Sequence, residues 1–123
     1  MTSITEISLS QRAAFRAHAE HLPSDIDRKV YVESSRDWRD PILGLGPRDA
    51  RFCIFGRDPG HTEVECAQPF VGKSGQLVRA ALHRRQYGAG AAAPDFAGSI
   101  AAGLEVFWLN TVPYQPVGNR AWS

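Results

Sequence analysis

The residues best suited to chemistry lie in a short turn that follows an apolar run. The run is Phe52-Cys53-Ile54-Phe55, and the turn is Gly56-Arg57-Asp58-Pro59-Gly60-His61. A short apolar run bounded by Gly and Pro is typical of a strand that is buried on both faces. Asp58 supplies a carboxylate to the turn, and His61 supplies an imidazole. Small molecules bind at the carboxyl ends of strands in open parallel sheets, so the pattern predicts a site here.

A second apolar run, Glu105–Leu109, ends at Asn110. Between the two runs, residues 74–85 have the spacing of a helix that turns apolar residues towards the core. Two buried strands joined by a crossover helix form a right-handed βαβ unit, and their ends meet at one edge of the sheet. The connectivity therefore predicts that Asp58 and His61 lie near Asn110.

The remaining segments are expected to support this unit. Ser10 is expected to cap a helix that ends at Leu22, and Lys29–Val32 is expected to form a short edge strand. In the helix at 74–85, Leu77, Val78, Ala81 and Leu82 are expected to face the core, and Arg79, Arg84 and Arg85 to be solvated. The small residues between Tyr87 and Pro94 indicate a linker, and residues 96–103 a short helical piece.

The composition indicates a single domain over residues 1–123 with a net charge of +1. This charge argues neither for nor against nucleic acid as a partner, because a local basic patch does not show in the total. Cys53 and Cys66 have unlike surroundings and lack metal-site spacing, so neither a disulfide nor a metal is predicted. No signal pattern or bilayer-length apolar run is present, so we expect a reduced, cytoplasmic protein without membrane association. The oligomeric state is left open.

From residue 52 onward the chain resembles the uracil-DNA glycosylase superfamily. Its iron–sulfur members carry Gly-Glu-Ala-Pro-Gly, an acid three residues on, and then Pro-Phe-Val-Gly-x-x-Gly-x-Leu. The matching residues here are Gly56, Pro59, Gly60, Glu63 and the segment Pro69–Leu77. Its classical members carry Gly-Gln-Asp-Pro-Tyr-His, of which residues 56–61 match four of six positions. Residues 110–120 are similar to the Asn-x-x-x-x-x-Pro-Pro-x-Asn-Arg segment of the iron–sulfur group.

This resemblance implies an α/β fold, a three-layer α/β/α domain with a parallel central sheet. It also implies hydrolysis of the N-glycosidic bond of uracil in DNA, with the nucleotide flipped out of the duplex. Asp58 matches the carboxylate that activates or orients the attacking water, Phe70 the aromatic that stacks on the base, and Asn110 the amide that reads its polar edge. Gly56, Gly60 and His61 complete the implied substrate-binding set, and the implied partner is DNA containing uracil or another damaged base.

Three departures from the family pattern qualify these implications. The cysteines that ligate an iron–sulfur cluster are absent, so no cofactor is expected. Gly60 replaces the tyrosine that blocks the thymine methyl group, so discrimination against thymine is in doubt. A His-containing motif near the family's C-terminus has no match here. We therefore expect the N-terminal part of a larger domain, truncated after the second core strand, whose activity at this length is open.

Each residue also has a structural alternative. Asp58 could form an Asx turn before proline, Phe70 could anchor the core, and Asn110 could cap a strand end. Glu63 and Glu65 are expected to be solvated loop carboxylates. Two other functions remain open as well. One is a non-catalytic module that binds a nucleobase or nucleic acid, and the other is an α/β protein that binds phosphate at the start of the helix at Ser74.

Overall fold

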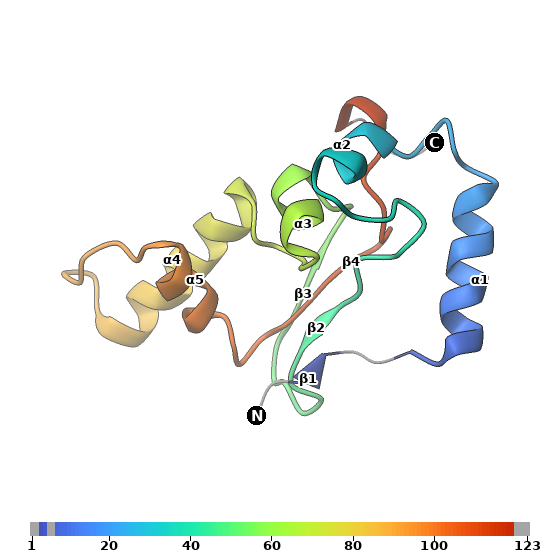
Figure 1. Cartoon of the computed structure of the whole chain (residues 1–123). Helices are drawn as coiled ribbons and strands as arrows, with labels where there is room; N and C mark the ends of the chain where they lie inside the picture. The colour runs from blue at the N-terminus through green and yellow to red at the C-terminus, as the bar shows by residue number, and fades with distance from the viewer. Residues whose placement is uncertain (1–2, 5–6, 120–123) are drawn as a thin grey trace.

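The structure is a computed structural model that describes residues 3–4 and 7–119. These residues form a mixed α/β arrangement, shown in Figure 1. Its helices are α1 (Leu9–Glu20), α2 (Arg28–Glu33), α3 (His61–Cys66), α4 (Lys73–Tyr87) and α5 (Phe96–Ala102), with a 3₁₀ turn at Val117–Asn119. Its strands are β1 (Ser3–Ile4), β2 (Leu45–Gly46), β3 (Cys53–Gly56) and β4 (Phe107–Asn110).

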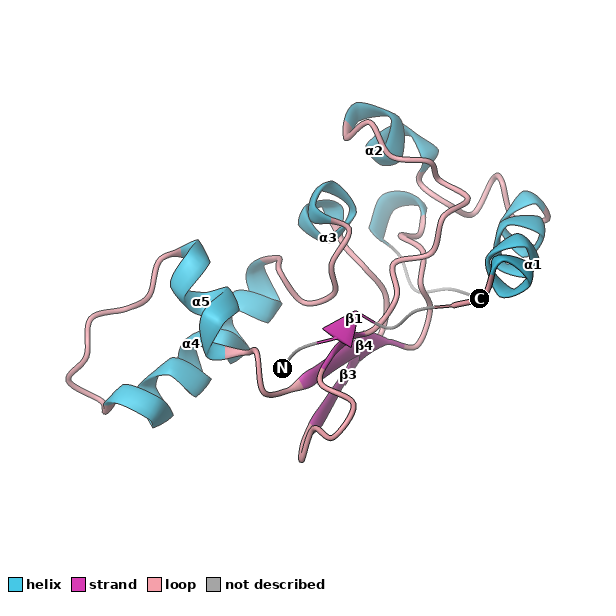
Figure 2. Cartoon of the chain, turned by 60° about the horizontal axis from the view of Figure 1, so that its bottom comes forward, coloured by secondary structure: helices cyan, strands magenta, loops and turns pink. Residues whose placement is uncertain are grey.

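The four strands form one sheet in the order β1-β2-β4-β3. Figure 2 shows the strands in magenta and the helices in cyan. β3 and β4 run parallel, with Gly56 opposite Asn110, as the βαβ connectivity predicts. β2 is antiparallel to β4, and β1 is antiparallel to β2. The sheet is therefore mixed, and the expectation of a parallel sheet holds only for the central pair. Gly46 permits the added strand, because a Cβ there would lie 2.6 Å from both the Phe107 Cα and the Val106 carbonyl oxygen.

The two parallel strands differ in burial. Trp108 on β4 is 2 % exposed. In contrast, Phe55 on β3 and Phe52, which precedes that strand, are each 66 % exposed, and Cys53 on β3 is exposed too. The prediction that the first strand is buried on both faces is wrong. The reason is position: β4 lies between β2 and β3, while β3 is the last strand of the sheet in the described part of the chain.

A hydrophobic cluster joins the N-terminal half of the chain to the loop after β4. It consists of Ala19, Ile26, Tyr31, Ile42, Val64 and Tyr114. The expected strand at Lys29–Val32 is instead part of helix α2. The alternation of valine and tyrosine imitates a strand, but tertiary packing decides the conformation. Tyr31 enters the cluster and its hydroxyl accepts a hydrogen bond from the Gln115 N–H at 3.0 Å, while Val32 stays 70 % exposed.

The first helix is present close to its predicted bounds, but its cap is Ser8 and not Ser10. The Ser8 hydroxyl accepts a hydrogen bond from the Gln11 N–H at 3.1 Å, and the Gln11 side chain accepts one from the Ser8 N–H at 2.8 Å. This reciprocal pair is a capping box, and it starts the helix two residues earlier than a cap at Ser10 would.

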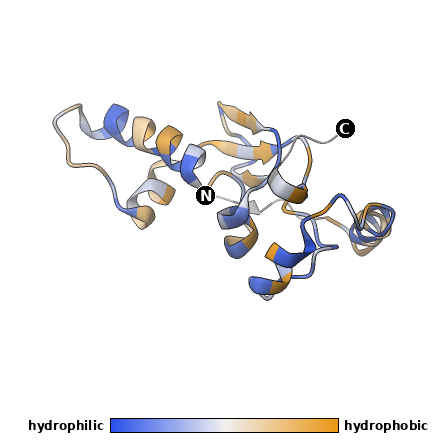
Figure 3. Cartoon of the chain, turned by 90° about the horizontal axis from the view of Figure 1, so that it is seen from above, coloured by the Kyte–Doolittle hydropathy of each residue, from blue (hydrophilic) through white to orange (hydrophobic). Residues whose placement is uncertain are grey.

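Helices α4 and α5 pack against each other beside the sheet (Figure 1). The Gln86 side-chain amide donates to the Ala102 carbonyl at 3.0 Å and so links the C-terminal end of α4 to the C-terminal end of α5. The predicted orientation of α4 is wrong at three positions, because Leu77 is 69 % exposed, Ala81 is exposed too, and Arg79 is buried. In Figure 3, α4 carries both hydrophilic and hydrophobic colours along its length. Among the helices of residues 3–4 and 7–119, none is long and apolar enough to cross a bilayer.

Because Tyr31 and Tyr114 are buried, we expect the stability of the fold to fall at alkaline pH. Burial raises the pKa of Tyr31 to about 12, and burial also raises the pKa of Tyr114 well above its usual range. Their unfolded forms ionise near pH 10, so the stability they contribute is complete below that pH and is lost as pH rises towards their folded pKa values. At pH 11 we expect the free energy of unfolding to be about 1 kcal/mol lower for each tyrosine, measured by urea unfolding.

The variant Tyr114→Phe should lose less stability than the original chain between pH 8 and pH 11. The matched control is Tyr87→Phe, because Tyr87 is 68 % exposed. An equal alkaline loss in both variants and the original chain would show that the buried phenol is not responsible.

Candidate functional site

A cleft of about 400 Å³ opens at the carboxyl ends of β3 and β4. The loop after β3, the first turns of α3 and α4, and the last residue of β4 form its walls. All of the predicted site residues line it: Gly56, Asp58, Gly60, His61, Phe70 and Asn110. The structure thus brings together residues that are up to half the chain apart, and their chemical roles stay predictions.

Gly56 is the point where the two strand ends and the aromatic loop meet. A Cβ on Gly56 would overlap the Asn110 Oδ1 atom and would lie 2.6 Å from the Phe70 Cζ atom. The amide and the ring therefore lie against the same glycine. Thr111 holds this corner, because its N–H donates to the Gly56 carbonyl at 2.9 Å and its hydroxyl donates to the same oxygen at 3.1 Å. Only glycine leaves room for this arrangement.

Asp58 lies two residues beyond β3, and its side chain is only 3 % exposed. Its Oδ2 atom accepts a hydrogen bond from the Arg57 Nε atom at 2.8 Å. The Arg57 side chain is 57 % exposed, and both residues line the cleft. Asp58 therefore combines a shielded carboxylate with an exposed cationic partner. A carboxylate of this kind can accept a proton from water or stabilise positive charge that develops beside it.

Phe70 precedes α4 in an unusual backbone conformation, with a φ of 56°. This left-handed region is disfavoured for residues that carry a Cβ. The Phe70 ring is half-buried and packs on Trp108 with ring centroids 5.3 Å apart and an interplanar angle of 45°. A partly exposed ring on a fixed support can stack on a planar ligand.

His61 begins α3 at the rim of the cleft. Its Nε2 atom lies 3.0 Å from the Glu65 Oε1 atom, and both side chains are more than half exposed. The solvated position of Glu65 agrees with the sequence prediction. Lys73 and Ser74, which start α4, are also exposed at the cleft. Arg120, the last residue of the family-like segment 110–120, lies outside the described residues.

Glu63 is a cleft residue whose role the sequence prediction missed. Its Oε1 atom accepts a hydrogen bond from the Gly60 N–H at 3.0 Å. Its Oε2 atom is buried without a hydrogen-bond partner in the described part of the chain, and a Cβ on Gly72 would lie 2.6 Å from it. Glu63 is thus not the solvated carboxylate that was expected. The signal for it was its position three residues after the N-cap of α3, where a glutamate commonly turns back to the cap.

Arg79 is the second residue that the prediction misplaced. It is 3 % exposed, and burial lowers the pKa of its guanidinium to about 10. The expectation of a solvated arginine is wrong, because the helix face that carries Arg79 packs against the loop at Phe70 and against Trp108.

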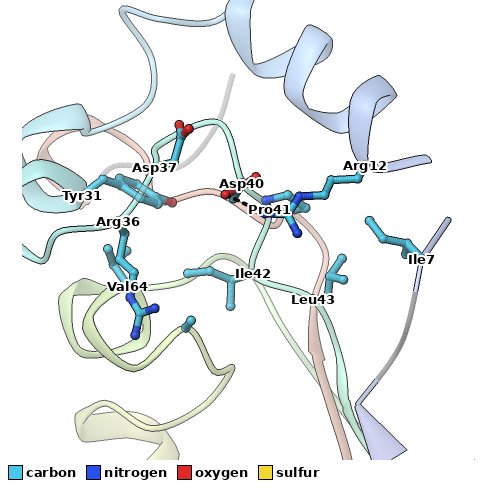
Figure 4. A pocket seen from close by; sticks show the side chains of 11 residues that line it. Ile7, Arg12, Tyr31, Arg36, Asp37, Asp40, Pro41, Ile42, Leu43 and Val64 are labelled. Carbon is cyan, nitrogen blue, oxygen red and sulfur yellow. Dashed lines mark ion pairs between the residues drawn. The ribbon is translucent and has the colours of Figure 1, made fainter. Parts of the chain in front are cut away.

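A second cavity, of about 250 Å³, lies between α1 and the segment that leads to β2 (Figure 4). It contains the ion pair between Arg12 and Asp40, at 2.9 Å, above apolar side chains that include Ile42 and Val64. None of the predicted site residues lines it. Across residues 3–4 and 7–119, no group of three or more His, Cys, Asp or Glu side chains is placed to hold a metal ion.

One known protein family matches most of the chain that carries this cleft. The family model described as the uracil DNA glycosylase superfamily matches residues 43–122. The matched region includes β3, the loop that carries Asp58, the Phe70 loop, α4 and the end of β4. Membership in this family indicates a DNA glycosylase-like function with DNA as the general partner. Because the match covers more than half of the 123 residues, this chain belongs to the uracil DNA glycosylase superfamily.

Proposed function

We propose that this protein hydrolyses the N-glycosidic bond of uracil, or of a related deaminated base, in DNA. The observation that carries the proposal is the meeting of Asp58, Phe70 and Asn110 in one cleft around Gly56. The parallel pair β3 and β4 further supports a three-layer α/β/α domain with a parallel sheet centre as the fold in which this site works.

The chemistry follows from what a flipped base loses. A base that leaves the helix gives up its stacking and its pairing, and the pocket has to replace both. The Phe70 ring offers the stacking face, and the Asn110 amide offers one donor and one acceptor, which match the O4 and N3–H groups of uracil. As the bond between the sugar C1′ and the uracil N1 breaks, the charged Asp58 carboxylate stabilises the positive charge that develops on the sugar. Water then attacks C1′ and gives its proton to Asp58, while the base leaves with the electrons of the broken bond and is protonated by solvent.

The test uses a labelled single-stranded oligonucleotide that contains one uracil. After incubation with the protein, alkali cleaves the strand wherever the base has been removed. We expect cleavage at the uracil position and none in a matched oligonucleotide that carries cytosine there. The absence of both cleavage and free uracil at stoichiometric protein would overturn the proposal.

A second candidate is a module that binds a nucleobase without hydrolysis. The observation that favours it is the contact between Arg57 and Asp58, because the carboxylate oxygen that Arg57 holds is not free to orient a water molecule. Binding of the uracil oligonucleotide without any product would support this candidate. Product formation would exclude it.

Asn110→Ala separates base reading from general DNA binding. We expect the preference for uracil over cytosine oligonucleotides to fall by about tenfold or more, since two hydrogen bonds worth about 1 kcal/mol each are removed. Fluorescence anisotropy with both oligonucleotides measures the preference. The cytosine oligonucleotide is the internal control, because its affinity should stay the same. An equal loss for both oligonucleotides would show that Asn110 serves the fold and does not read the base.

A further inference from the structure

Arg79 is a buried cation whose guanidinium donates hydrogen bonds to the loop that carries Phe70. Its Nε atom donates to the Phe70 carbonyl at 2.7 Å, and its Nη2 atom donates to the Pro69 carbonyl at 3.4 Å. Its Nη1 atom lies 3.5 Å from the Ile100 carbonyl. Among the described residues its partners are thus backbone carbonyls and not carboxylates. A buried guanidinium is costly, and an apolar side chain would fill the space without that cost.

The same guanidinium also supports the ring of Phe70 indirectly. Its Cζ atom lies 4.1 Å from the centre of the Trp108 ring, within the range of a cation–π contact. Trp108 is anchored by its indole N–H, which donates to the Gly103 carbonyl at 2.8 Å. The other neighbour of Trp108 is the Phe70 ring, at 5.3 Å. Arg79, Trp108 and Phe70 therefore form one continuous series of contacts that ends in the cleft.

The backbone of Phe70 needs such support. Its φ of 56° places it in the left-handed region that a Cβ disfavours. Strained residues of this kind persist only where their surroundings hold them, and they cluster at binding sites. The two carbonyls that Arg79 holds belong to Phe70 and to the residue before it, so the contact acts on the strained peptide units themselves.

We propose that Arg79 is a positioning residue that holds Phe70 in the orientation that stacks on an extruded base. This inference rests on the proposed function for its purpose, whereas the restraint on the loop can be measured without DNA. Arg79 does not contact the base. It acts through the Phe70 backbone and through the Trp108 ring.

The first experiment measures the loop alone. Chymotrypsin cleaves after phenylalanine, and mass spectrometry of the fragments reports cleavage between Phe70 and Val71. We expect Arg79→Met to raise the rate of this cleavage by about tenfold, because local opening governs proteolysis of a folded chain. Arg84→Met is the matched control, since Arg84 lies on the same helix but is exposed, and its rate should equal that of the original chain. A wild-type cleavage rate in Arg79→Met would overturn the inference.

The second experiment tests whether the restraint serves base stacking. A stacking contact between a base and an aromatic ring changes affinity by about tenfold or more, so Phe70→Ala should lower kcat/KM for uracil excision by at least that factor. Arg79→Met should approach the same loss, and Arg79→Lys should recover part of it. In a Phe70→Ala background, Arg79→Met should cause no further loss, because the ring it positions is gone.

A merely structural arginine would give a different pattern. Equal losses from Arg79→Met with and without the Phe70 ring would overturn the positioning role. Circular dichroism establishes first that each variant is folded, and Arg79→Lys provides the comparison if Arg79→Met unfolds. A wild-type chain without uracil excision would overturn the proposed function, while the chymotrypsin rates would still decide whether Arg79 restrains the loop.

Discussion

Replacing Asp58 by asparagine is expected to lower the single-turnover rate of uracil excision by about 10²- to 10⁴-fold. The asparagine amide has nearly the same shape as the carboxylate, but it cannot accept a proton from water and it carries no charge. The Asp58 side chain is 3 % exposed, so solvent cannot easily replace its function. Affinity for the uracil oligonucleotide, measured by anisotropy, should change by less than tenfold, because Phe70 and Asn110 remain in place.

The matched control for this substitution is Asp49→Asn. Asp49 is exposed and does not line the cleft, so its variant should excise uracil at the original rate. If Asp58→Asn retained the full rate in a chain with demonstrated activity, Asp58 would not be the group that activates water. An equal loss of affinity and rate would instead indicate a role in binding.

Replacing Gly75 by alanine is expected to lower the free energy of unfolding by about 2 kcal/mol, as overpacking of a well-packed contact does. Gly75 lies in the first turn of α4, where a Cβ would overlap the Phe70 carbonyl group. This neighbour is backbone, so it cannot rotate away as a side chain would. Alanine favours a helix over glycine by up to about 1 kcal/mol, and this gain offsets only part of the overlap. Urea unfolding followed by circular dichroism measures the change.

Gly90→Ala provides the control for that prediction. Gly90 lies in the connection between α4 and α5, and a Cβ there would meet nothing within 4 Å. We expect its free energy of unfolding to change by less than about 0.5 kcal/mol. The steric argument would be contradicted if the two alanine variants were equally stable. Gly75→Ala should also reduce uracil excision, because the displaced loop carries Phe70.

Local sequence patterns, together with the connectivity of one βαβ unit, predicted part of the fold and of the site. The turn after Phe55, the parallel pairing of the two apolar runs and the gathering of Asp58 with Asn110 at one sheet edge all follow from short-range pattern and connectivity. The prediction failed at Lys29–Val32, where alternation typical of a strand occurs in a helix. It failed there because tertiary contacts outweigh the local preference for a strand. In the helix, Tyr31 packs into the hydrophobic cluster and its hydroxyl accepts a hydrogen bond from the Gln115 N–H.

The exposure of β3 and the burial of Arg79 could not be predicted for a different reason. Both depend on which element becomes the neighbour of another, and an apolar run looks the same in the centre of a sheet and at its edge. β2 pairs with β4, which leaves β3 at the edge and Phe55 exposed. Arg79 is one of several arginines on its helix, and only the packing of α4 against the Phe70 loop distinguishes it.

The amino-acid sequence alone therefore determined the chemical groups of the site, the turn that carries Asp58 and the sheet edge at which the groups meet. These depend on residue type, on glycine and proline in the turn, and on the handedness of one crossover. The tertiary structure alone decided the mixed sheet, the strained conformation of Phe70 and the buried guanidinium that holds it. These depend on contacts between residues distant in the chain, where the cost of burying a charge or straining a backbone is balanced only by the assembled neighbours.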